Sequence, residues 1–140
     1  MKEYDLSRFT EAHKEKYDTA LSEIKAGRKR SHWMWYIFPQ LRGLGRSVTA
    51  EFYGIADLAE AKAFLSDPYL GKNLREISEV LLTLESDNAT EIFDRPDDMK
   101  LRSSMTLFDC ASETDHVFQK VLQKFFKGRP DYRTLDMLRK

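Results

Sequence analysis

The chain has 140 residues and a mass of 16.4 kDa, the usual size of one folded unit, so we expect a single domain over residues 1–140. Its 23 basic and 23 acidic side chains cancel, which excludes a general electrostatic preference for nucleic acid or an anionic membrane. Cys110 is the only cysteine, so an internal disulfide is excluded and a reducing compartment, the cytoplasm, is expected. No signal peptide is visible, and no window approaches the roughly 18 apolar residues of a membrane span.

The first half of the chain carries two predicted helical regions with recognisable ends. Apolar residues recur at helical spacing over residues 6–24, which predicts one or two helices, and Gly27 stands where a left-handed residue would end them. A second helix is predicted over residues 57–66, because Asp57 and Glu60 stand in capping-box register before an apolar stripe.

The second half of the chain is predicted to be helical almost throughout. Its clearest amphipathic helix has apolar residues at alternating steps of four and three, namely Leu70, Leu74, Ile77, Leu81 and Leu84. A further helix is expected after Pro96, which fits a first-turn position. The last strong helix begins at Val117 and ends before Gly128, and a short tail helix is expected from Asp131. The pattern predicts an all-α fold, either a compact single-domain multi-helix bundle or a short helical superhelix.

Charge is unevenly distributed along the chain. No acidic residue occurs between Glu23 and Glu51, whereas this window holds Lys25, Arg28, Lys29, Arg30, Arg42 and Arg46. Bases are favourable at a helix C-terminus only within its last turn, so Arg42 and Arg46 need another explanation. The acidic stretch over residues 85–98 is interpreted as helix-end chemistry, because acids favour helix N-termini.

The segment HWMWYIF, residues 32–38, is almost continuously apolar, so part of it must enter the core. In one interpretation Trp33 and Trp35 are both core residues, since large aromatic side chains dominate core packing. In the other, an indole or the Tyr36 ring forms a pocket wall that stacks on a planar ligand, while arginines of the basic window hold an anionic group. His32 is a weak catalytic candidate and is favoured as a structural residue, because spacing identifies no paired acid or nucleophile.

The segment PQLRGLGRS, residues 39–47, is the one long irregular region that we expect. It is not a dinucleotide-binding fingerprint, because a third glycine and the surrounding strand and crossover helix are missing. Its glycines let the backbone present N–H groups to an anion, and Ser47 is placed to cap a helix that begins at Val48. The loop is therefore either an anion site clamped by its arginines or a solvent-exposed connector.

The segment KLRSSMTLFD is a second candidate surface. Ser103, Ser104 and Thr106 are poor choices for a helix interior, because their hydroxyls compete for backbone groups. They either bond across to another helix, which is the favoured interpretation, or face a cleft together with Lys100 and Arg102.

The sequence contains no motif that supports acyl transfer or metal binding. Ser104 lacks the Gly-x-Ser-x-Gly turn of a hydrolase nucleophile and has no placed histidine. His13, His32 and His116 are widely separated, and neither HExxH nor CxxC occurs. We therefore expect no metal and no cofactor.

Three stretches, RKRSHWMWYIFPQLRGLGRS, YGI and DDMKLRSSMTLFD, together resemble the domain-of-unknown-function family 1810 of bacteria and fungi, which sometimes carries an old calpastatin label. The resemblance covers nearly the whole chain, from the DLSRF opening to the RPD near the end. It implies a single-domain, almost wholly α-helical protein but no activity, substrate or catalytic residue. The calpastatin label implies a protease inhibitor, which would be extended and disordered, whereas this chain has the pattern of a folded domain.

Two functions follow from the sequence as alternatives. The first is a small-ligand-binding domain, with enzymatic turnover left open, that has a cationic, aromatic-walled pocket for a phosphate-bearing or other anionic metabolite. The second is a non-enzymatic helical domain that docks a protein partner. Nucleic acid and membrane are disfavoured as partners, because the basic window is short and the molecule is neutral overall. The candidate ligand-binding residues are Arg28, Arg30, Ser31, His32, Trp33, Trp35, Tyr36, Gln40, Arg42, Arg46, Lys100, Arg102, Ser103 and Ser104.

Overall fold

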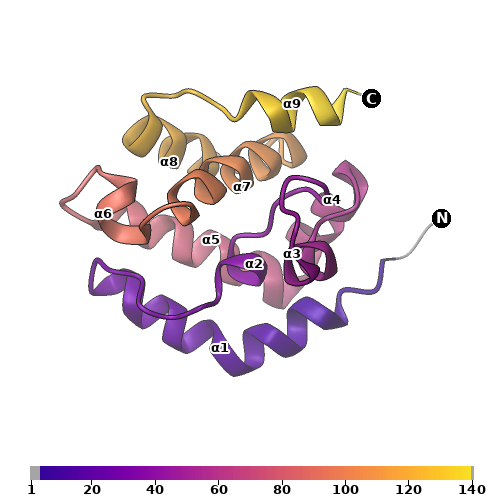
Figure 1. The fold of residues 1–140 in the computed structure, drawn as a ribbon, viewed down its shortest axis with the longest axis horizontal. Helices are drawn as coiled ribbons and strands as arrows, with labels where there is room; N and C mark the ends of the chain where they lie inside the picture. Colours follow the sequence, from indigo (N-terminus) through magenta and orange to yellow (C-terminus); the bar gives the residue numbers. More distant parts are fainter. Residues whose placement is uncertain (1–3, 140) are drawn as a thin grey trace.

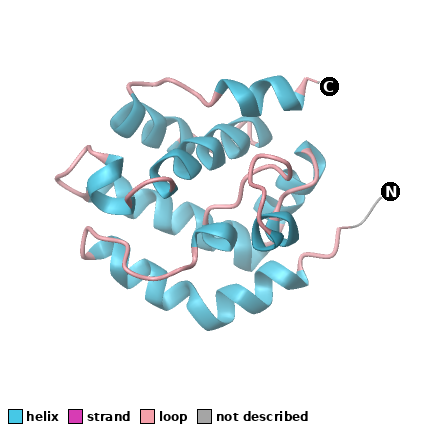
Figure 2. Ribbon diagram, viewed as in Figure 1, coloured by secondary structure: helices cyan, strands magenta, loops and turns pink. Residues whose placement is uncertain are grey.

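The structure, a computed structural model, describes residues 4–139 and folds them into nine helices (Figures 1 and 2). In chain order these are α1 (Ser7–Lys25), α2 (Met34–Ile37), α3 (Val48–Tyr53), α4 (Leu58–Ser66), α5 (Pro68–Thr83), α6 (Ala89–Phe93), α7 (Asp97–Ala111), α8 (Val117–Phe126) and α9 (Tyr132–Leu138). Within residues 4–139 there is no strand, only an isolated bridge between Leu41 and Ile55. The predicted all-α fold is confirmed. None of the helices described combines the length and the apolar composition needed to cross a membrane.

The longer helices pack against one another in a continuous series. Helix α1 packs on α5, α5 on α8 and α8 on α7, while α4 contacts both α5 and α7. The short helices α2 and α3 contact each other, and α2 also contacts α1. Figure 1 shows α2 and α3 between α1 and α7. This arrangement places the aromatic segment of the sequence beside α7, which is distant along the chain.

Helix α5 illustrates how local sequence and packing agree. The Asp67 carboxylate caps it by accepting hydrogen bonds from two backbone N–H groups of the first turn, at 2.9 and 3.0 Å. The apolar face predicted for this helix is buried. Gly71 is required there, because a Cβ atom at this position would lie 2.2 Å from the carbonyl oxygen of Leu65. The close approach of α4 and α5 therefore depends on a residue without a side chain.

The predicted starts of three other helices are confirmed by their caps. Ser47, Asp57 and Asp131 each accept a hydrogen bond from the backbone N–H three residues further on, at 3.0, 2.9 and 3.2 Å. The predicted capping box of α4 is only half present. The Glu60 carboxylate accepts from the backbone N–H of Ala56 at 2.8 Å, one residue before the N-cap.

Two predicted boundaries need correction. Pro96 is the N-cap residue of α7 rather than a first-turn residue, and the peptide bond before it is cis. Residues 26–33 form a second irregular segment besides the predicted one at 39–47. It begins with Gly27, whose φ of 82° confirms the predicted left-handed end of α1.

A row of phenylalanine rings crosses the core and joins four helices. The ring centroids of Phe9 and Phe64 are 5.2 Å apart, those of Phe64 and Phe108 are 5.3 Å apart, and those of Phe108 and Phe118 are 6.0 Å apart. All four side chains are fully buried. Each such pair contributes about 0.5–1.5 kcal/mol beyond the area it buries, so this row stabilises the contacts of α1, α4, α7 and α8.

Candidate functional site

The basic window of the sequence pairs with the acidic stretch across the fold. The Arg28 guanidinium donates hydrogen bonds to the Asp94 carboxylate and to the Glu91 carbonyl oxygen, both at 2.6 Å. Lys29 Nζ lies 2.9 Å from an Asp97 carboxylate oxygen. The acidic stretch therefore does more than stabilise helix N-termini, because its carboxylates also neutralise part of the basic window. Arg28 is a predicted anion-binding residue, and its guanidinium already donates hydrogen bonds to these two groups.

Glu23 in α1 anchors the segment that follows the helix. Its carboxylate accepts hydrogen bonds from the backbone N–H of Arg30 at 2.7 Å, from that of Ser31 at 3.0 Å, and from the Trp33 indole at 2.9 Å, and it also accepts from the Ser31 hydroxyl. Burial alone would raise the pKa of this carboxyl, but the donated hydrogen bonds lower it to about 2. Trp33 is fully buried, so the core interpretation holds for this tryptophan.

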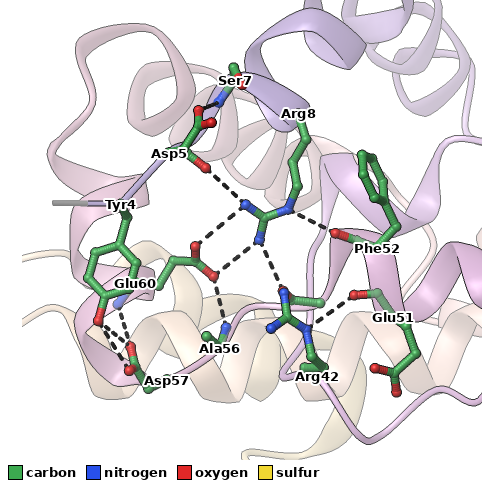
Figure 3. Close-up of polar contacts among 11 residues, drawn as sticks. Tyr4, Asp5, Ser7, Arg8, Arg42, Glu51, Phe52, Ala56, Asp57 and Glu60 are labelled. Atoms are coloured by element: carbon green, nitrogen blue, oxygen red, sulfur yellow. Dashed lines mark hydrogen bonds and ion pairs between the residues drawn. The ribbon is translucent and has the colours of Figure 1, made fainter.

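Two arginines meet at the C-terminal end of α3 (Figure 3). Arg8 and Arg42 each donate to the carbonyl oxygen of Gly54 at 3.1 Å, and Arg8 also donates to the carbonyl oxygen of Phe52 at 2.9 Å. Arg8 forms an ion pair of 3.2 Å with the buried carboxylate of Glu60. These hydrogen bonds satisfy carbonyl groups that have no hydrogen-bond partner within the helix, because they lie at its C-terminal end. The structure thus places Arg42, predicted to clamp an anion, on the backbone that follows α3.

Polar side chains of α7 hold the connection between α8 and α9. Arg102 donates to the carbonyl oxygen of Pro130 at 2.7 Å, Ser103 donates to the Asp131 carboxylate at 3.0 Å, and the Thr106 hydroxyl accepts from the Asp131 backbone N–H at 2.8 Å. For Ser103 and Thr106 the favoured interpretation, bonding across to another segment, is confirmed.

The other arginines of the basic window do not meet at a common site. Arg30 and Arg46 are exposed, and their side chains form no hydrogen bond or ion pair with any group in residues 4–139. His32 is exposed as well, and its carbonyl oxygen accepts a hydrogen bond of 3.3 Å from the hydroxyl of Tyr36, a buried residue. Across the described part of the chain, no three His, Cys, Asp or Glu side chains are placed to hold a metal ion.

His13 is a buried residue that positions the aromatic segment and that sequence reasoning missed. One ring nitrogen bonds to the carbonyl oxygen of Tyr36 at 2.8 Å, and the other accepts from the Asn73 amide at 3.0 Å. Burial lowers the pKa of His13 to about 4, so the ring is neutral near pH 7. The signal in the sequence was its position between Phe9 and Tyr17 at steps of four residues, which places the ring on the buried face of α1.

A small hollow opens between α2, α3 and α7, and we call it the Trp35 pocket. The residues that line it include Trp35, Phe38, Gln40, Ala50, Tyr53 and Lys100. The open space between these side chains is about 240 Å³ with the mouth included, yet the centre of a water molecule can occupy only about 10 Å³ of it. In this conformation the pocket therefore has room for about one water molecule. Three of the predicted ligand-binding residues, Trp35, Gln40 and Lys100, meet here.

A cation stands over the aromatic wall of the Trp35 pocket. Lys100 Nζ lies 5.5 Å from the centroid of the half-buried Trp35 ring and 3.4 Å from an Asp97 carboxylate oxygen. Because Asp97 also pairs with Lys29, the three charged groups carry a net charge of one positive unit. The side of the pocket formed by α7 therefore favours an anionic group.

Several polar groups at the Trp35 pocket have no partner in the protein. The Trp35 indole N–H, the Gln40 amide and the Tyr53 hydroxyl form no side-chain hydrogen bond with any group in residues 4–139. One turn further along α7, the hydroxyl of Ser104 is fully buried and also lacks a partner. Polar groups of side chains that line a hollow and have no partner in the described residues are available to a ligand.

A broader surface depression, with about 910 Å³ of open space including its mouth, lies around Arg75, Cys110 and Asp115. Its main charges already neutralise each other, since Arg75 Nε lies 2.8 Å from an Asp115 carboxylate oxygen. Burial raises the pKa of the Cys110 thiol, which disfavours the reactive thiolate. This depression therefore offers less chemistry to a ligand than the Trp35 pocket does.

Comparison with known proteins agrees with the fold. The family model described as "Protein of unknown function (DUF1810)" matches residues 3–138. The chain is also similar to the crystal structure of the conserved hypothetical protein Rv1873 from Mycobacterium tuberculosis, with 44% sequence identity, a TM-score of 0.96 and coverage of 98% of each chain. No curated protein matches the chain. The two matches extend over the elements that build the Trp35 pocket, and neither description names a ligand or a reaction.

Proposed function

The chain belongs to the DUF1810 family, whose description names no activity, and we propose from the geometry that it binds a small metabolite with a planar group and an anionic group in the Trp35 pocket. This proposal keeps the aromatic wall expected from the sequence. It replaces the expected arginine clamp with a single cation, Lys100.

The position of Lys100 over the Trp35 ring is the observation that carries the proposal. A planar group that enters the mouth gains contact with the indole face, and its anionic group gains the ammonium 5.5 Å from the ring centroid. The Gln40 amide and the Tyr53 hydroxyl add two hydrogen-bonding groups to the same hollow. An apolar hollow with a few convergent polar groups is typical of a small-molecule site.

Helix α3 is a short wall of the pocket, held at its C-terminal end by hydrogen bonds from Arg8 and Arg42. It contributes Ala50 and Tyr53 to the lining, yet none of its own residues is buried. An element with little buried surface separates from the core at low free-energy cost. Outward movement of α3 would widen the pocket toward the roughly 300 Å³ at the lower end of ordinary ligand sites.

A docking domain for a protein partner is the second candidate, and one observation favours it. Val48 and Phe52 lie one turn apart on α3 with exposed fractions of 88% and 56%. Two exposed side chains on a short helix form a smaller apolar patch than the several hundred Å² that mark an interaction surface. We therefore rank this function second.

Thermal denaturation in the presence of planar anions tests the proposed function. The panel holds nucleotides, aromatic carboxylates and aromatic phosphate esters, and a ligand at 100 times its Kd stabilises the folded protein by about 2.7 kcal/mol. We expect at least one compound to raise the Tm by several degrees. Lys100→Met should abolish this rise, whereas Lys120→Met, on the exposed face of α8, should retain it.

Trp35→Phe provides an independent optical readout. A ligand that stacks on the indole should change the fluorescence of the wild type, and this change should vanish in the variant, because Trp33 is sealed in the core. The proposal fails if no panel member raises the Tm. It also fails if Lys100→Met and Lys120→Met respond equally to every compound that does.

A further inference from the structure

Residues 41–55 form a compact loop that closes on itself beside the Trp35 pocket. The two ends of the loop meet at the bridge between Leu41 and Ile55, where the backbone N–H of Arg42 donates to the carbonyl oxygen of Ile55 at 2.8 Å. A surface loop of up to about 16 residues whose ends lie close together is an Ω-loop, and such loops frequently carry function. Helix α3 lies within this Ω-loop.

The part of the Ω-loop between its two ends, residues 42–54, is held together from within, and we call it the α3 lobe. The Arg42 guanidinium donates to the carbonyl oxygens of Glu51 at 3.2 Å and of Gly54 at 3.1 Å, so the start of the lobe is tied to its end. The two residues at the ends of the Ω-loop are buried, whereas none of residues 42–53 is. The base of the loop is therefore fixed in the core, while the lobe is a segment of low local stability that can move as a unit.

Arg8, in the first turn of α1, is the polar link between the α3 lobe and the rest of the protein. Its guanidinium donates to the carbonyl oxygens of Phe52 at 2.9 Å and of Gly54 at 3.1 Å (Figure 3). Within residues 4–139, no other side chain outside the Ω-loop forms a hydrogen bond or ion pair with the lobe. The lobe is otherwise attached through the packing of half-buried side chains, among them Leu44 and Tyr53.

Glu60 of α4 fixes the direction of the Arg8 guanidinium. Its buried carboxylate lies 3.2 Å from Arg8 Nη2 and also accepts from the backbone N–H of Ala56, directly after the base of the Ω-loop, at 2.8 Å. Breaking a buried ion pair is costly, whereas the carbonyl groups of the lobe carry no net charge. When the lobe moves outward, the bonds from Arg8 to the carbonyl groups therefore break while the ion pair with Glu60 remains.

From these observations we infer that the α3 lobe is a gate over the Trp35 pocket and that Arg8 is the latch that holds it closed. The inference rests on the proposed function, because it assigns to that pocket the element that admits a ligand. The lobe supplies Ala50, Tyr53 and Gly54 to the lining, and the centre of a water molecule can occupy only about 10 Å³ of the hollow. A ligand can therefore enter only when the lobe moves, and the strength of the latch sets how often it does.

The rate at which a thiol in the pocket wall is alkylated tests the inference without any ligand. Ala50→Cys places the thiol on the lobe side of the wall, and Cys110→Ser removes the exposed natural thiol. Iodoacetamide is the reagent, because its neutrality makes it insensitive to the charges that are changed. The double variant Arg8→Met with Glu60→Gln is compared with Glu60→Gln alone, so the two backgrounds differ only at the latch and neither leaves a buried carboxylate unpaired. We expect the loss of the latch to accelerate alkylation roughly tenfold, the effect of losing hydrogen bonds from a charged donor.

Two further thiols serve as controls for this comparison. Val48→Cys replaces a side chain that is 88% exposed, so it should react at the same rate in both backgrounds. Ala20→Cys is fully buried in α1 and reports opening of the whole fold, so the loss of the latch should not accelerate it.

Equal alkylation rates for Ala50→Cys in the two backgrounds overturn the inference. An acceleration of the same size at Ala20→Cys also overturns it, because Arg8 then stabilises the fold as a whole rather than the closed lobe. Either result leaves the proposed function standing, since the denaturation panel measures binding without these variants. A panel without a ligand removes the proposed function, whereas the alkylation rates still decide whether Arg8 holds the lobe.

Discussion

Replacing Glu23 with glutamine removes the charge that organises the segment carrying both tryptophans. The carboxylate accepts hydrogen bonds from Arg30, Ser31 and Trp33 at 2.7 to 3.0 Å. The three N–H groups donate to the same carboxylate oxygen, and the second oxygen accepts from the Ser31 hydroxyl. A glutamine side chain keeps one acceptor oxygen for the N–H groups but places an NH2 donor against the Ser31 hydroxyl. The variant therefore loses the hydrogen bond from the Ser31 hydroxyl to the carboxylate and the charge that strengthens the three N–H bonds.

The size of the effect follows from the pKa of Glu23. The donated hydrogen bonds lower it from 4.5 to about 2 against the opposing effect of burial, which at 1.36 kcal/mol per pKa unit corresponds to about 3 kcal/mol. Because the side chain is only half-buried, solvent screening reduces this to about 2 kcal/mol. The folded pKa lies below the unfolded one, so the stabilisation is present above pH 4.5 and is lost as the pH falls toward 2.

Urea denaturation of Glu23→Gln at pH 7 and at pH 3 measures this contribution. We expect the variant to lose about 2 kcal/mol of unfolding free energy at pH 7 and clearly less at pH 3. Glu11→Gln, an exposed change on the same helix, serves as the control and should stay within about 0.5 kcal/mol of the wild type. The reasoning is refuted if Glu23→Gln is as stable as Glu11→Gln at pH 7, or if its deficit is independent of pH.

Two further predictions concern groups that hold the framework of the pocket. His13 stays neutral in the folded protein because burial lowers its pKa from 6.5 to about 4, so the unfolded chain binds a proton over this interval that the folded protein does not. The wild type should lose up to about 3 kcal/mol between pH 6.5 and 4 in urea titrations, and His13→Gln should not show this slope; identical slopes would contradict the assignment. Arg8→Met leaves the Glu60 carboxylate buried without its cation and should cost on the order of 3 kcal/mol, of which the double variant with Glu60→Gln recovers part. Unchanged Tm values for Arg8→Met and the wild type would show that the ion pair contributes nothing.

The helices could be predicted because the signals that specify them are local. The apolar stripe of α5 and the caps Ser47, Asp57 and Asp131 act within a few residues of themselves, and the structure has each where the sequence places it. The error over residues 26–33 arose where local rules compete with distant contacts. The backbone of residues 26–33 is held by Glu23 and by α6 rather than by its own turns.

The charge pairings could not be predicted because their partners are far apart in the chain. Arg28 and Asp94 are separated by 66 positions, and Arg8 and Glu60 by 52. The complementary charge of the two segments was visible in the sequence, but charge alone does not say which side chains meet. Arg42 illustrates the difficulty, since its position beside a glycine-rich loop suggested an anion clamp and the fold directs it to backbone carbonyl groups.

The Trp35 pocket was partly visible in the sequence. Trp35, Gln40 and Lys100 were among the candidate ligand-binding residues, and these residues line the same hollow. Their meeting depends on the packing of α2 and α3 between α1 and α7, which no local pattern specifies (Figure 1). Tyr53 was missed as a lining residue, because a tyrosine at the end of a short helix carries no distinguishing signal.

The two indole N–H groups offer the most direct test of ligand binding at the pocket. The Trp33 indole donates to Glu23 in the sealed core, whereas the Trp35 indole has no partner within residues 4–139 and belongs to the pocket wall. Titrating benzoate into 15N-labelled protein, with the two indole signals assigned through Trp35→Phe, should shift the Trp35 signal in a saturable way and leave the Trp33 signal in place. A Trp35 signal that stays fixed up to millimolar benzoate, nicotinate and indole-3-carboxylate, or equal shifts of both indoles, would contradict the account.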